Sequence, residues 1–179
     1  MLGLIKSINA VTRTWEIVGF VDDGKKPGEI INGLKVLGNT GCMAEIKEKT
    51  AAVIAVALPE IRKKIKESVV NPNMYFPAVI HPSAIIEDKE FVSVGEGSIL
   101  CANSVLTTNI TIGKFVLANL ATTINHDAVI SDFSTQMPGV SISTGAQVGE
   151  GCYIGTGSKI SKPEITAAWQ TLSTGTIIA

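Results

Sequence analysis

His126 and Asp127 are the residues of this chain whose types best fit proton transfer. They stand together in the stretch "ATTINHDAVISDF", residues 121–133, and His81 is the only other histidine. An imidazole titrates near neutral pH, so it is well matched to take a proton from an amine or a hydroxyl group. A carboxylate beside the ring fixes its tautomer and raises its basicity. The pair predicts a general base at His126, and the alternative is a surface histidine without a task.

The place of this pair in the fold follows from a six-residue repeat. Of the fifteen residues found at every sixth position from Val94 to Ile178, twelve are Val, Ile or Leu. The residue four places further on is small or β-branched in most units, which fits an inward position near a turn. Three such units close one triangular coil, and coils stack at the strand spacing of ~4.8 Å. The repeat therefore predicts a parallel β-helix.

The register of the repeat sets His126 at a corner of a coil, with its side chain directed outward. Because one coil is three units long, Thr108 and Thr144 should lie at the same corner of the two adjacent coils. This geometry suits acyl transfer from a thioester, which needs a hydrogen-bond donor for the oxyanion of its tetrahedral intermediate. A main-chain N–H group around Thr144 or Gly145 is positioned to be that donor.

The first 77 residues differ from the repeat, because strand-like and helix-like stretches alternate there. We expect a helix near the start, a strand in "EIVGFV", a short helix in "MAEIKEK", a strand in "AAVIAVA" and a helix in "EIRKKIKESV". This order predicts a small parallel α/β sheet with right-handed crossovers. We therefore divide the chain into two domains, 1–77 and 78–179.

Asp22 and Asp23 are the polar candidates of the first domain. They directly follow the strand expected in "EIVGFV", at the carboxyl end where open α/β sheets bind ligands. The two carboxylates therefore predict a substrate contact, and a polar loop without a ligand is an equally good interpretation.

The composition argues against several classes of partner. Lys and Arg number 15 against 16 Asp and Glu, so we expect no nucleic acid and no membrane partner. Three widely spaced cysteines fit neither a disulfide framework nor a zinc knuckle, and two distant histidines cannot supply a three-histidine zinc site. No apolar run is long enough to span a bilayer. A cytoplasmic protein without a metal is the expectation.

Five stretches of the chain resemble a known family: "WEIVGFVDD", "INGLKVLG", "HPSAIIEDKEFVSVGEGS", "INHDAVISDF" and "GAQVGEGCYIGTGS". They are similar to the hexapeptide-repeat sugar acetyltransferases that act on sialic acids or nucleotide-sugars. The resemblance implies a truncated Rossmann-like α/β domain followed by a left-handed β-helix. It also implies a homotrimer that acetylates an amino or hydroxyl group of a nucleotide-sugar or sialic acid in surface glycan biosynthesis.

The same resemblance assigns roles to the residues of the β-helix. His126 would take the proton of the acceptor, and Asp127 would support it. Acetyl-CoA would be the co-substrate, in contact with the chain around Thr144 and Gly145. Thr135 occupies a place where the family often carries a second histidine that touches the cofactor, so we count it among the cofactor-binding candidates.

The start of the chain departs from the family. Relatives have a strand and a glycine-rich turn whose main-chain N–H groups bind phosphates before the first helix, whereas "MLGLIKSINAV" resembles that helix itself. The resemblance implies that Asp22 and Asp23 contact a nucleotide-sugar and that the chain is an acetyl-CoA-dependent acetyltransferase. The alternative is a non-catalytic trimeric β-helix scaffold, a truncated relative that binds no substrate.

Overall fold

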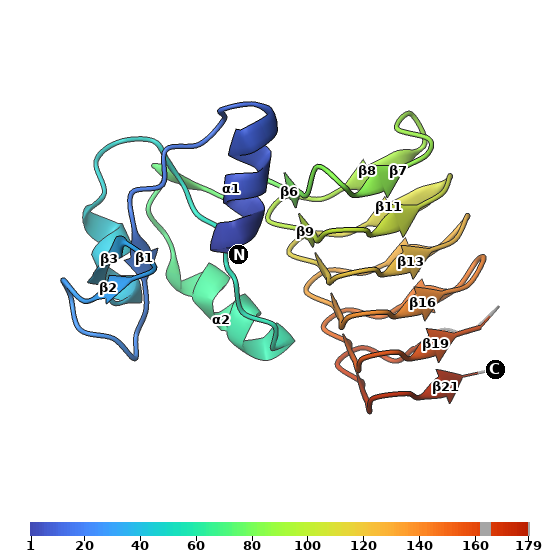
Figure 1. Cartoon of the computed structure of the whole chain (residues 1–179). Coiled ribbons are helices and arrows are strands. Elements are labelled where there is room, and N and C mark those ends of the chain that lie inside the picture. Colours follow the sequence, from blue (N-terminus) through green and yellow to red (C-terminus); the bar gives the residue numbers. More distant parts are fainter. Residues whose placement is uncertain (162–165, 179) are drawn as a thin grey trace.

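The chain folds into two parts that lie side by side (Figure 1). The computed structural model describes residues 1–161 and 166–178. The first part is a small α/β unit, and the second is a left-handed parallel β-helix, as predicted. The domain bounds 1–77 and 78–179 stay a prediction, although the first strand that pairs within the coils is β6 (Val79–Ile80).

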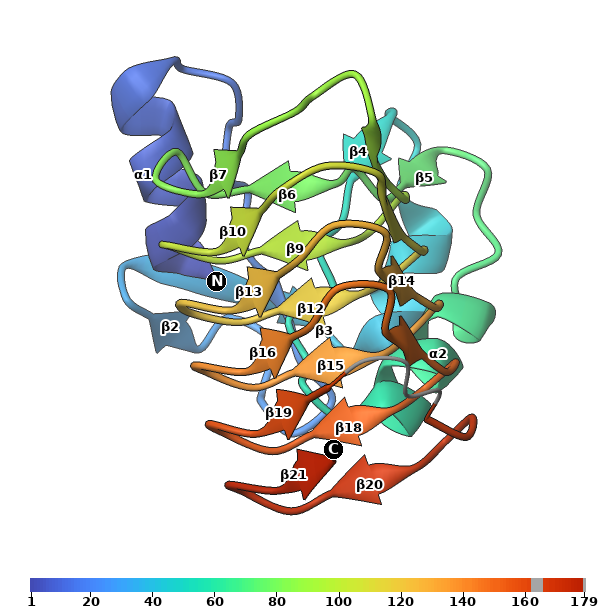
Figure 2. The same ribbon diagram turned by 90° about the vertical axis from the view of Figure 1, so that its right-hand side faces the viewer.

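Three parallel sheets form the faces of the β-helix (Figure 2). Face 1 consists of β6, β9 (Ile99–Leu100), β12 (Leu117–Ala118), β15 (Thr135–Gln136), β18 (Tyr153–Ile154) and β20 (Thr171–Leu172). Face 2 consists of β7 (Ile85–Ile86), β10 (Val105–Leu106), β13 (Thr123–Ile124), β16 (Ser141–Ile142), β19 (Lys159–Ile160) and β21 (Ile177–Ile178). Face 3 consists of β8 (Val92–Val94), β11 (Ile110–Ile112), β14 (Val129–Ile130) and β17 (Gln147–Val148).

Apolar side chains fill the interior of the coils at the predicted positions. Leu106, Ile124 and Ile142 pair in register along face 2 and are 0–1% exposed. Burying each such side chain contributes about 1.5–3 kcal/mol. Small or β-branched residues occupy the fifth position of most units, as Ser104 and Cys152 illustrate, and both are buried; Ile110 and Gln170 are exceptions. The six-residue rule is therefore confirmed as an alternation of large and small interior side chains.

From Gly97 onward, each described corner contains one residue in the left-handed backbone conformation. Such residues recur every six positions from Gly97 to Gly175 in the described ranges, with φ between +53° and +72°. Glycine, asparagine and aspartate tolerate this conformation better than other residues do, and most of the corner positions carry one of them. The corners thus have a local sequence signal of their own, independent of the interior residues.

The corner between faces 3 and 1 is an exception, because aromatic residues occupy its left-handed positions. Phe115, Phe133 and Trp169 all have positive φ. The rings of Phe115 and Phe133 are stacked, with centroids 5.3 Å apart and planes 6° from parallel. Gly151 lies between Phe133 and Trp169 in this column, and a Cβ atom there would overlap the indole ring. Ring packing offsets the backbone strain at this corner.

The first part contains less regular structure than predicted. The helices α1 (Leu2–Val11) and α2 (Pro59–Ser68) form where apolar periodicity indicates them, and no helix of the described residues is both long and apolar enough to cross a membrane. The two expected strands shrink to β1 (Phe20–Val21) and β4 (Thr50–Ala51). The prediction of an α-helix in "MAEIKEK", residues 43–49, is wrong. The start of this stretch belongs to the 3-10 helix η1 (Thr40–Glu45), which ends at Glu45.

The strands of the first part belong to two separate sheets. In one sheet β1 pairs in parallel with β3 (Leu34–Gly38), which also forms an antiparallel hairpin with β2 (Ile30–Ile31). In the other sheet β4 pairs in parallel with β5 (Met74–Tyr75). The hairpin turns at Asn32 and Gly33, both with positive φ, and an Asn-Gly pair is the standard signal for such a turn. The sequence analysis missed that signal and expected only a parallel sheet.

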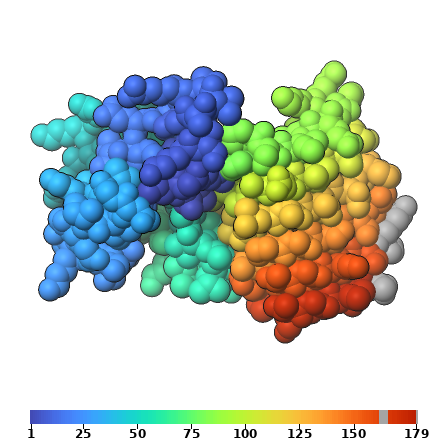
Figure 3. Space-filling view, in the orientation of Figure 1, coloured from blue at the N-terminus to red at the C-terminus, as the bar shows by residue number. Residues whose placement is uncertain are grey.

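Arg62 joins α2 to the β-helix, and Figure 3 shows this helix pressed against the coils. Its side chain is 1% exposed. Its Nε atom donates to the carbonyl oxygen of Phe115 at 2.8 Å, and its Nη2 atom donates to that of Phe133 at 2.6 Å. Nη1 donates to the carbonyl oxygen of Val56 at 2.7 Å. Burial lowers the pKa of Arg62 to about 10, so the guanidinium remains charged at neutral pH and carbonyl dipoles stabilise it.

Candidate active site

His126 lies at the corner between faces 2 and 3, where β13 ends and β14 follows. The side chains of His126 and Asp127 are 52% and 55% exposed, so both are open to solvent in the single chain. Nδ1 of His126 lies 2.8 Å from Oδ2 of Asp127, and Nε2 lies 3.1 Å from Oγ1 of Thr144. Three of the predicted site residues therefore form one connected group.

These two contacts define the tautomer of the neutral His126 ring. A carboxylate only accepts hydrogen bonds, so the Nδ1 atom of the neutral ring carries the proton and donates it to Asp127. The Nε2 atom then keeps its lone pair and accepts a hydrogen bond from the Thr144 hydroxyl group. An acceptor amine that replaced this hydroxyl group would meet an unprotonated nitrogen, which is the requirement for general-base catalysis.

Asp127 is held in place by its backbone and by a second polar side chain. Its φ of +64° belongs to the corner conformation, and its N–H group donates to the carbonyl oxygen of Thr108 at 3.3 Å. Nδ2 of Asn109 donates to Oδ1 of Asp127 at 3.2 Å. Asn109 was missed at the sequence level, although it lies one coil before Asp127 and the 18-residue period was sufficient to find it.

The N–H group of Gly145 is already used within the corner. It donates to the carbonyl oxygen of His126 at 2.9 Å, and Asp127 makes the equivalent bond to Thr108 in the preceding coil. The N–H group of Thr144 makes no hydrogen bond within the described ranges. Within the described residues the N–H group of Thr144 is thus unbonded, whereas that of Gly145 is already engaged.

Thr135 lies apart from the His126 corner, in β15 on face 1. It is 0% exposed, because α2 and the segment before it cover this face. Its hydroxyl group donates to the carbonyl oxygen of Ala57 at 2.7 Å and accepts a hydrogen bond from Nη2 of Arg62 at 2.9 Å. The structure thus gives Thr135 a role between the two parts of the chain, and a bound cofactor would have to displace α2 to reach it.

Asp22 and Asp23 lie at the carboxyl end of β1, as expected, and line a cavity of about 470 Å³ in the first part. One carboxylate oxygen of Asp23 accepts hydrogen bonds from the N–H and hydroxyl groups of Thr40 at 2.6 and 2.9 Å. These bonds lower the pKa of Asp23. Asp22 accepts a hydrogen bond from the N–H group of Gly24 at 2.9 Å. Local loop contacts therefore engage both carboxylates.

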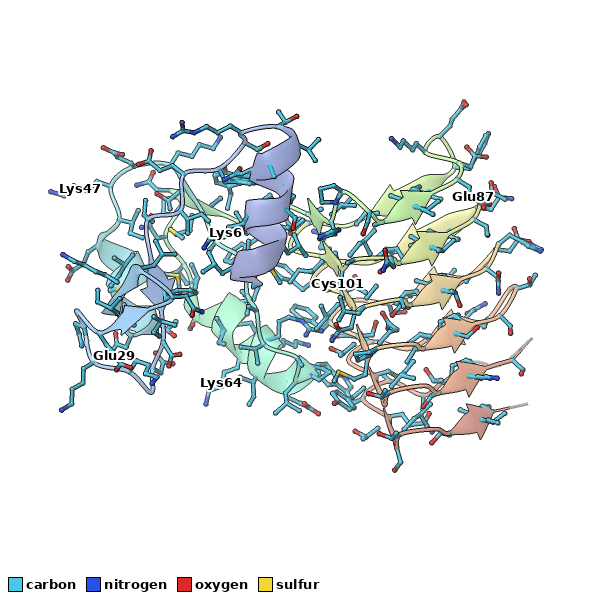
Figure 4. The ribbon with its side chains drawn as sticks, viewed as in Figure 1. Lys6, Glu29, Lys47, Lys64, Glu87 and Cys101 are labelled. Carbon is cyan, nitrogen blue, oxygen red and sulfur yellow. The ribbon has the colours of Figure 1, made fainter. Side chains whose placement is uncertain are left out.

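The two candidate sites lie on opposite sides of one chain. The first part packs along face 1, where Ile99 and Leu117 contact the apolar side of α1. His126 occupies the corner that is remote from face 1. Figure 4 shows this separation with two labelled residues. Glu87 begins the corner that lies two coils before that of His126, and it points away on the right. Glu29, in the first part of the chain, lies on the left. One chain does not bring Asp22 next to His126.

Coils of six-residue units with an exposed His–Asp pair at a corner define a hexapeptide-repeat protein. A family model described as the PglD N-terminal domain matches residues 4–69. The chain is 31% identical over 145 residues to a GDP-perosamine N-acetyltransferase of Escherichia coli O157:H7, with 79% of this chain and 62% of that protein aligned. The alignment thus spans less than two thirds of the relative.

Solved structures agree with this likeness. The acetyltransferase domain of PglB from Neisseria gonorrhoeae FA1090 is 25% identical, with a TM-score of 0.87 over 99% of this chain and 85% of that one. WeeI from Acinetobacter baumannii AYE is 28% identical, with a TM-score of 0.78 over 99% and 89%. The chain is therefore similar to left-handed β-helix sugar acetyltransferases over nearly its whole length, in agreement with the resemblance of its five sequence stretches.

Proposed function

We propose that the chain transfers an acetyl group from acetyl-CoA to an amino group of a nucleotide-linked sugar. The observation that carries this proposal is the half-exposed ring of His126 with an unprotonated Nε2 atom. The 2.8 Å hydrogen bond from Nδ1 to Asp127 determines this tautomer. The aligned Escherichia coli relative is described as acting on GDP-perosamine, which favours nitrogen over oxygen as the acceptor. The PglB domain is described as an acetyltransferase, which supports acetyl-CoA as co-substrate.

In the proposed reaction His126 moves one proton from the amine to the leaving thiol. The amine nitrogen attacks the thioester carbonyl carbon, and Nε2 of His126 takes the proton that the nitrogen loses as the C–N bond forms. The tetrahedral intermediate carries its negative charge on oxygen, and the N–H group of Thr144, which donates to no atom of the described residues, is suited to stabilise it. When the C–S bond breaks, the imidazolium returns the proton and CoA leaves as the thiol.

Asp127 is the proposed positioning residue of this reaction. Its carboxylate holds the Nδ1–H tautomer and stabilises the imidazolium that forms during proton transfer. The hydrogen bond from Asn109 keeps the other carboxylate oxygen in place. These residues act on the sugar only through His126.

We propose that Asp22 and Asp23 contact the nucleotide-sugar, and that the complete enzyme is a homotrimer. The separation of these carboxylates from His126 within one chain supports a site that two subunits share. The exposure of apolar side chains on faces 2 and 3 also supports assembly, because Ile85, Val129 and Ile177 are 52%, 37% and 66% exposed in the single chain. We also propose that the enzyme works in the cytoplasm, in the synthesis of surface glycans. The reason is that the Escherichia coli relative is described by a nucleotide-linked sugar, GDP-perosamine.

The test of this function is CoA thiol release from acetyl-CoA in the presence of GDP-perosamine and related amino sugar nucleotides. His126→Asn keeps a donor toward Asp127 but has no basic nitrogen, so we expect kcat to fall about 10²–10⁴-fold. His81→Asn is the matched control, because within the described part of the chain the ring of His81 hydrogen-bonds only to Ser83, at the entry to the coils. Equal rates for the wild-type protein and His126→Asn would exclude His126 as the base.

The scaffold hypothesis is separated from this one by calorimetry. A catalytic chain binds both acetyl-CoA and the amino sugar nucleotide, whereas a scaffold binds neither. Absence of both binding signals, together with no thiol release by the wild-type protein, would favour the scaffold.

A further inference from the structure

The hydroxyl group of Thr144 occupies the place on His126 that the acceptor amine needs. Its Oγ1 atom lies 3.1 Å from Nε2 of the ring. Because Nδ1 carries the proton that Asp127 accepts, the lone pair of Nε2 faces the hydroxyl group, which therefore donates. The proposed acetyl transfer uses the same lone pair to take a proton from the amine. The hydroxyl group must then leave Nε2 when the acceptor binds, and it needs a new partner.

The backbone around Thr144 is fixed to the coil of His126. The N–H group and the Nδ2 atom of Asn125 both donate to the carbonyl oxygen of Ile142, at 3.0 and 3.1 Å. The N–H group of Gly145 donates to the carbonyl oxygen of His126 at 2.9 Å. These bonds hold the chain on both sides of Thr144. Its hydroxyl group can therefore change partner by rotation about χ1, without movement of the chain.

Rotation about χ1 can bring the hydroxyl group beside the main-chain N–H group of the same residue. Oγ1 has three staggered positions, and two of them are gauche to the main-chain nitrogen. In those positions the hydroxyl and N–H groups can donate to one oxygen atom. The N–H group of Thr144 donates to no atom of the described residues. An amine on Nε2 lies beside Thr144, and the oxyanion is only two bonds from the attacking nitrogen, so both donors are close to it.

We propose that Thr144 is a catalytic residue that stabilises the oxyanion through its hydroxyl group as well as its N–H group, and that His126 holds this hydroxyl group until the acceptor binds. This role rests on the proposed acetyl transfer and adds a second donor to it. The amine displaces the hydroxyl group from Nε2, gives up its proton there and forms the C–N bond. The hydroxyl group keeps its own proton and donates a hydrogen bond to the carbonyl oxygen as negative charge develops. The proton on Nε2 passes to the thiolate when the C–S bond breaks.

Thr108 occupies the same corner one coil earlier, and its hydroxyl group has a different partner. Its Oγ1 atom donates to Oδ2 of Asp88 at 2.9 Å. The main-chain carbonyl group of Thr108, which a side-chain substitution retains, accepts the N–H group of Asp127. Thr108→Val therefore removes the same hydroxyl group as Thr144→Val at an equivalent place, without a change at Nε2. It is the matched control.

Steady-state thiol release from acetyl-CoA, with GDP-perosamine or a related amino sugar nucleotide as acceptor, tests this role. Valine has the shape of threonine but no donor, so Thr144→Val should lower kcat about 10²–10³-fold, as loss of one oxyanion donor does. KM should change by less than about threefold, because the interaction forms in the transition state. Thr144→Ser restores a hydroxyl donor and should recover at least about a tenth of the wild-type kcat. Thr108→Val should have the wild-type rate.

A double variant separates stabilisation of the oxyanion from positioning of the ring. If Thr144 acted only by orienting His126, Thr144→Val would have no effect once the ring is replaced in His126→Asn. An oxyanion hole continues to contribute to catalysis in enzymes that have lost their base. We therefore expect Thr144→Val to lower the residual rate of His126→Asn by about tenfold or more. An equal rate for His126→Asn and the double variant would overturn the proposal.

Nitrogen-15 NMR measures the hydrogen bond on Nε2 without turnover. The chain has two histidines, so a His81→Asn background leaves His126 as the source of the imidazole signals. In Thr144→Val the Nε2 resonance should move to higher frequency because its lone pair loses a donor, and in Thr108→Val it should stay in place. Amide signals of the coils that match the wild-type protein show that each variant is folded. An unmoved Nε2 resonance in folded Thr144→Val would contradict the proposed resting contact.

The kinetic outcomes also distinguish this role from the proposed function itself. Thiol release by the wild-type protein together with an equal kcat for Thr144→Val, or a change in KM alone, would overturn the role of the hydroxyl group and leave acetyl transfer intact. Absence of thiol release by the wild-type protein with every amino sugar nucleotide would overturn acetyl transfer and this role together.

Discussion

Replacing Arg62 with alanine tests how the two parts of the chain are held together. Three carbonyl groups, those of Val56, Phe115 and Phe133, have Arg62 as their only hydrogen-bond donor in the described structure. A buried acceptor left without a donor costs about 1–3 kcal/mol. Because water can enter part of the space left by the side chain, we use the lower half of that range. At about 1–2 kcal/mol for each of the three carbonyl groups, the free energy of unfolding should then fall by about 3–6 kcal/mol.

Urea unfolding at neutral pH, followed by circular dichroism and by tryptophan fluorescence, measures this change. Lys64→Ala is the matched control, since Lys64 lies on the same helix and points into solvent (Figure 4), and we expect it to alter stability by less than ~0.5 kcal/mol. Arg62→Lys keeps the charge, but all its donors are on a single nitrogen, which cannot reach the carbonyl groups of both Val56 and Phe133. This variant should therefore be nearly as unstable as Arg62→Ala. If Arg62→Ala unfolds at the midpoint of Lys64→Ala, the reasoning from orphaned carbonyl groups is refuted.

Three further predictions concern the corner and the interior of the coils. In Asp127→Asn the new side chain tolerates the left-handed backbone and keeps an oxygen near Nδ1 of His126, so the fold should persist. Loss of the charge should lower kcat by about tenfold or more. Unchanged kinetics would remove Asp127 from the mechanism. Gln136 is fully buried, and within the described residues its Oε1 atom has no partner and its amide donates only to Ser134; Gln136→Leu should raise the free energy of unfolding by roughly 1–2 kcal/mol in urea titrations, and a loss of stability would mean that the amide is needed. Gly155→Ala would press a Cβ atom against main-chain atoms of the next coil, 2.5 Å from the nearest, and should lower the free energy of unfolding by about 1–3 kcal/mol; a melting temperature equal to that of the wild-type protein would contradict the packing argument.

The β-helix and its candidate base were predictable because the burial pattern is local and periodic. Every inward position recurs after six residues, so the register alone predicted that His126 lies at a corner, near Thr144. The corner conformation also has a local cause, since residues such as Asp127 and Gly145 tolerate positive φ. In such a fold the neighbour in space is the residue 18 places away, and counting along the chain finds it.

The first part was less predictable because its strands depend on partners far apart in the sequence. Apolar runs in "EIVGFV" and "AAVIAVA" have strand composition, yet only β1 and β4 form. A strand is defined by hydrogen bonds to a neighbour, and the facing edges of these two segments have none in the described structure. Composition predicts which residues can form a strand, and tertiary structure decides whether a neighbour is present.

The sequence by itself determined the coil, the corner and the chemical types at the site. Only the tertiary structure decided that Thr135 is buried beneath Arg62, and that the N–H group of Gly145 is bonded to His126. Only the tertiary structure separated Asp22 from the His126 corner. The physical reason is that a repeat specifies contacts between adjacent coils. The packing of α2 against face 1 depends instead on one buried residue, Arg62, and no periodicity in the sequence marks it.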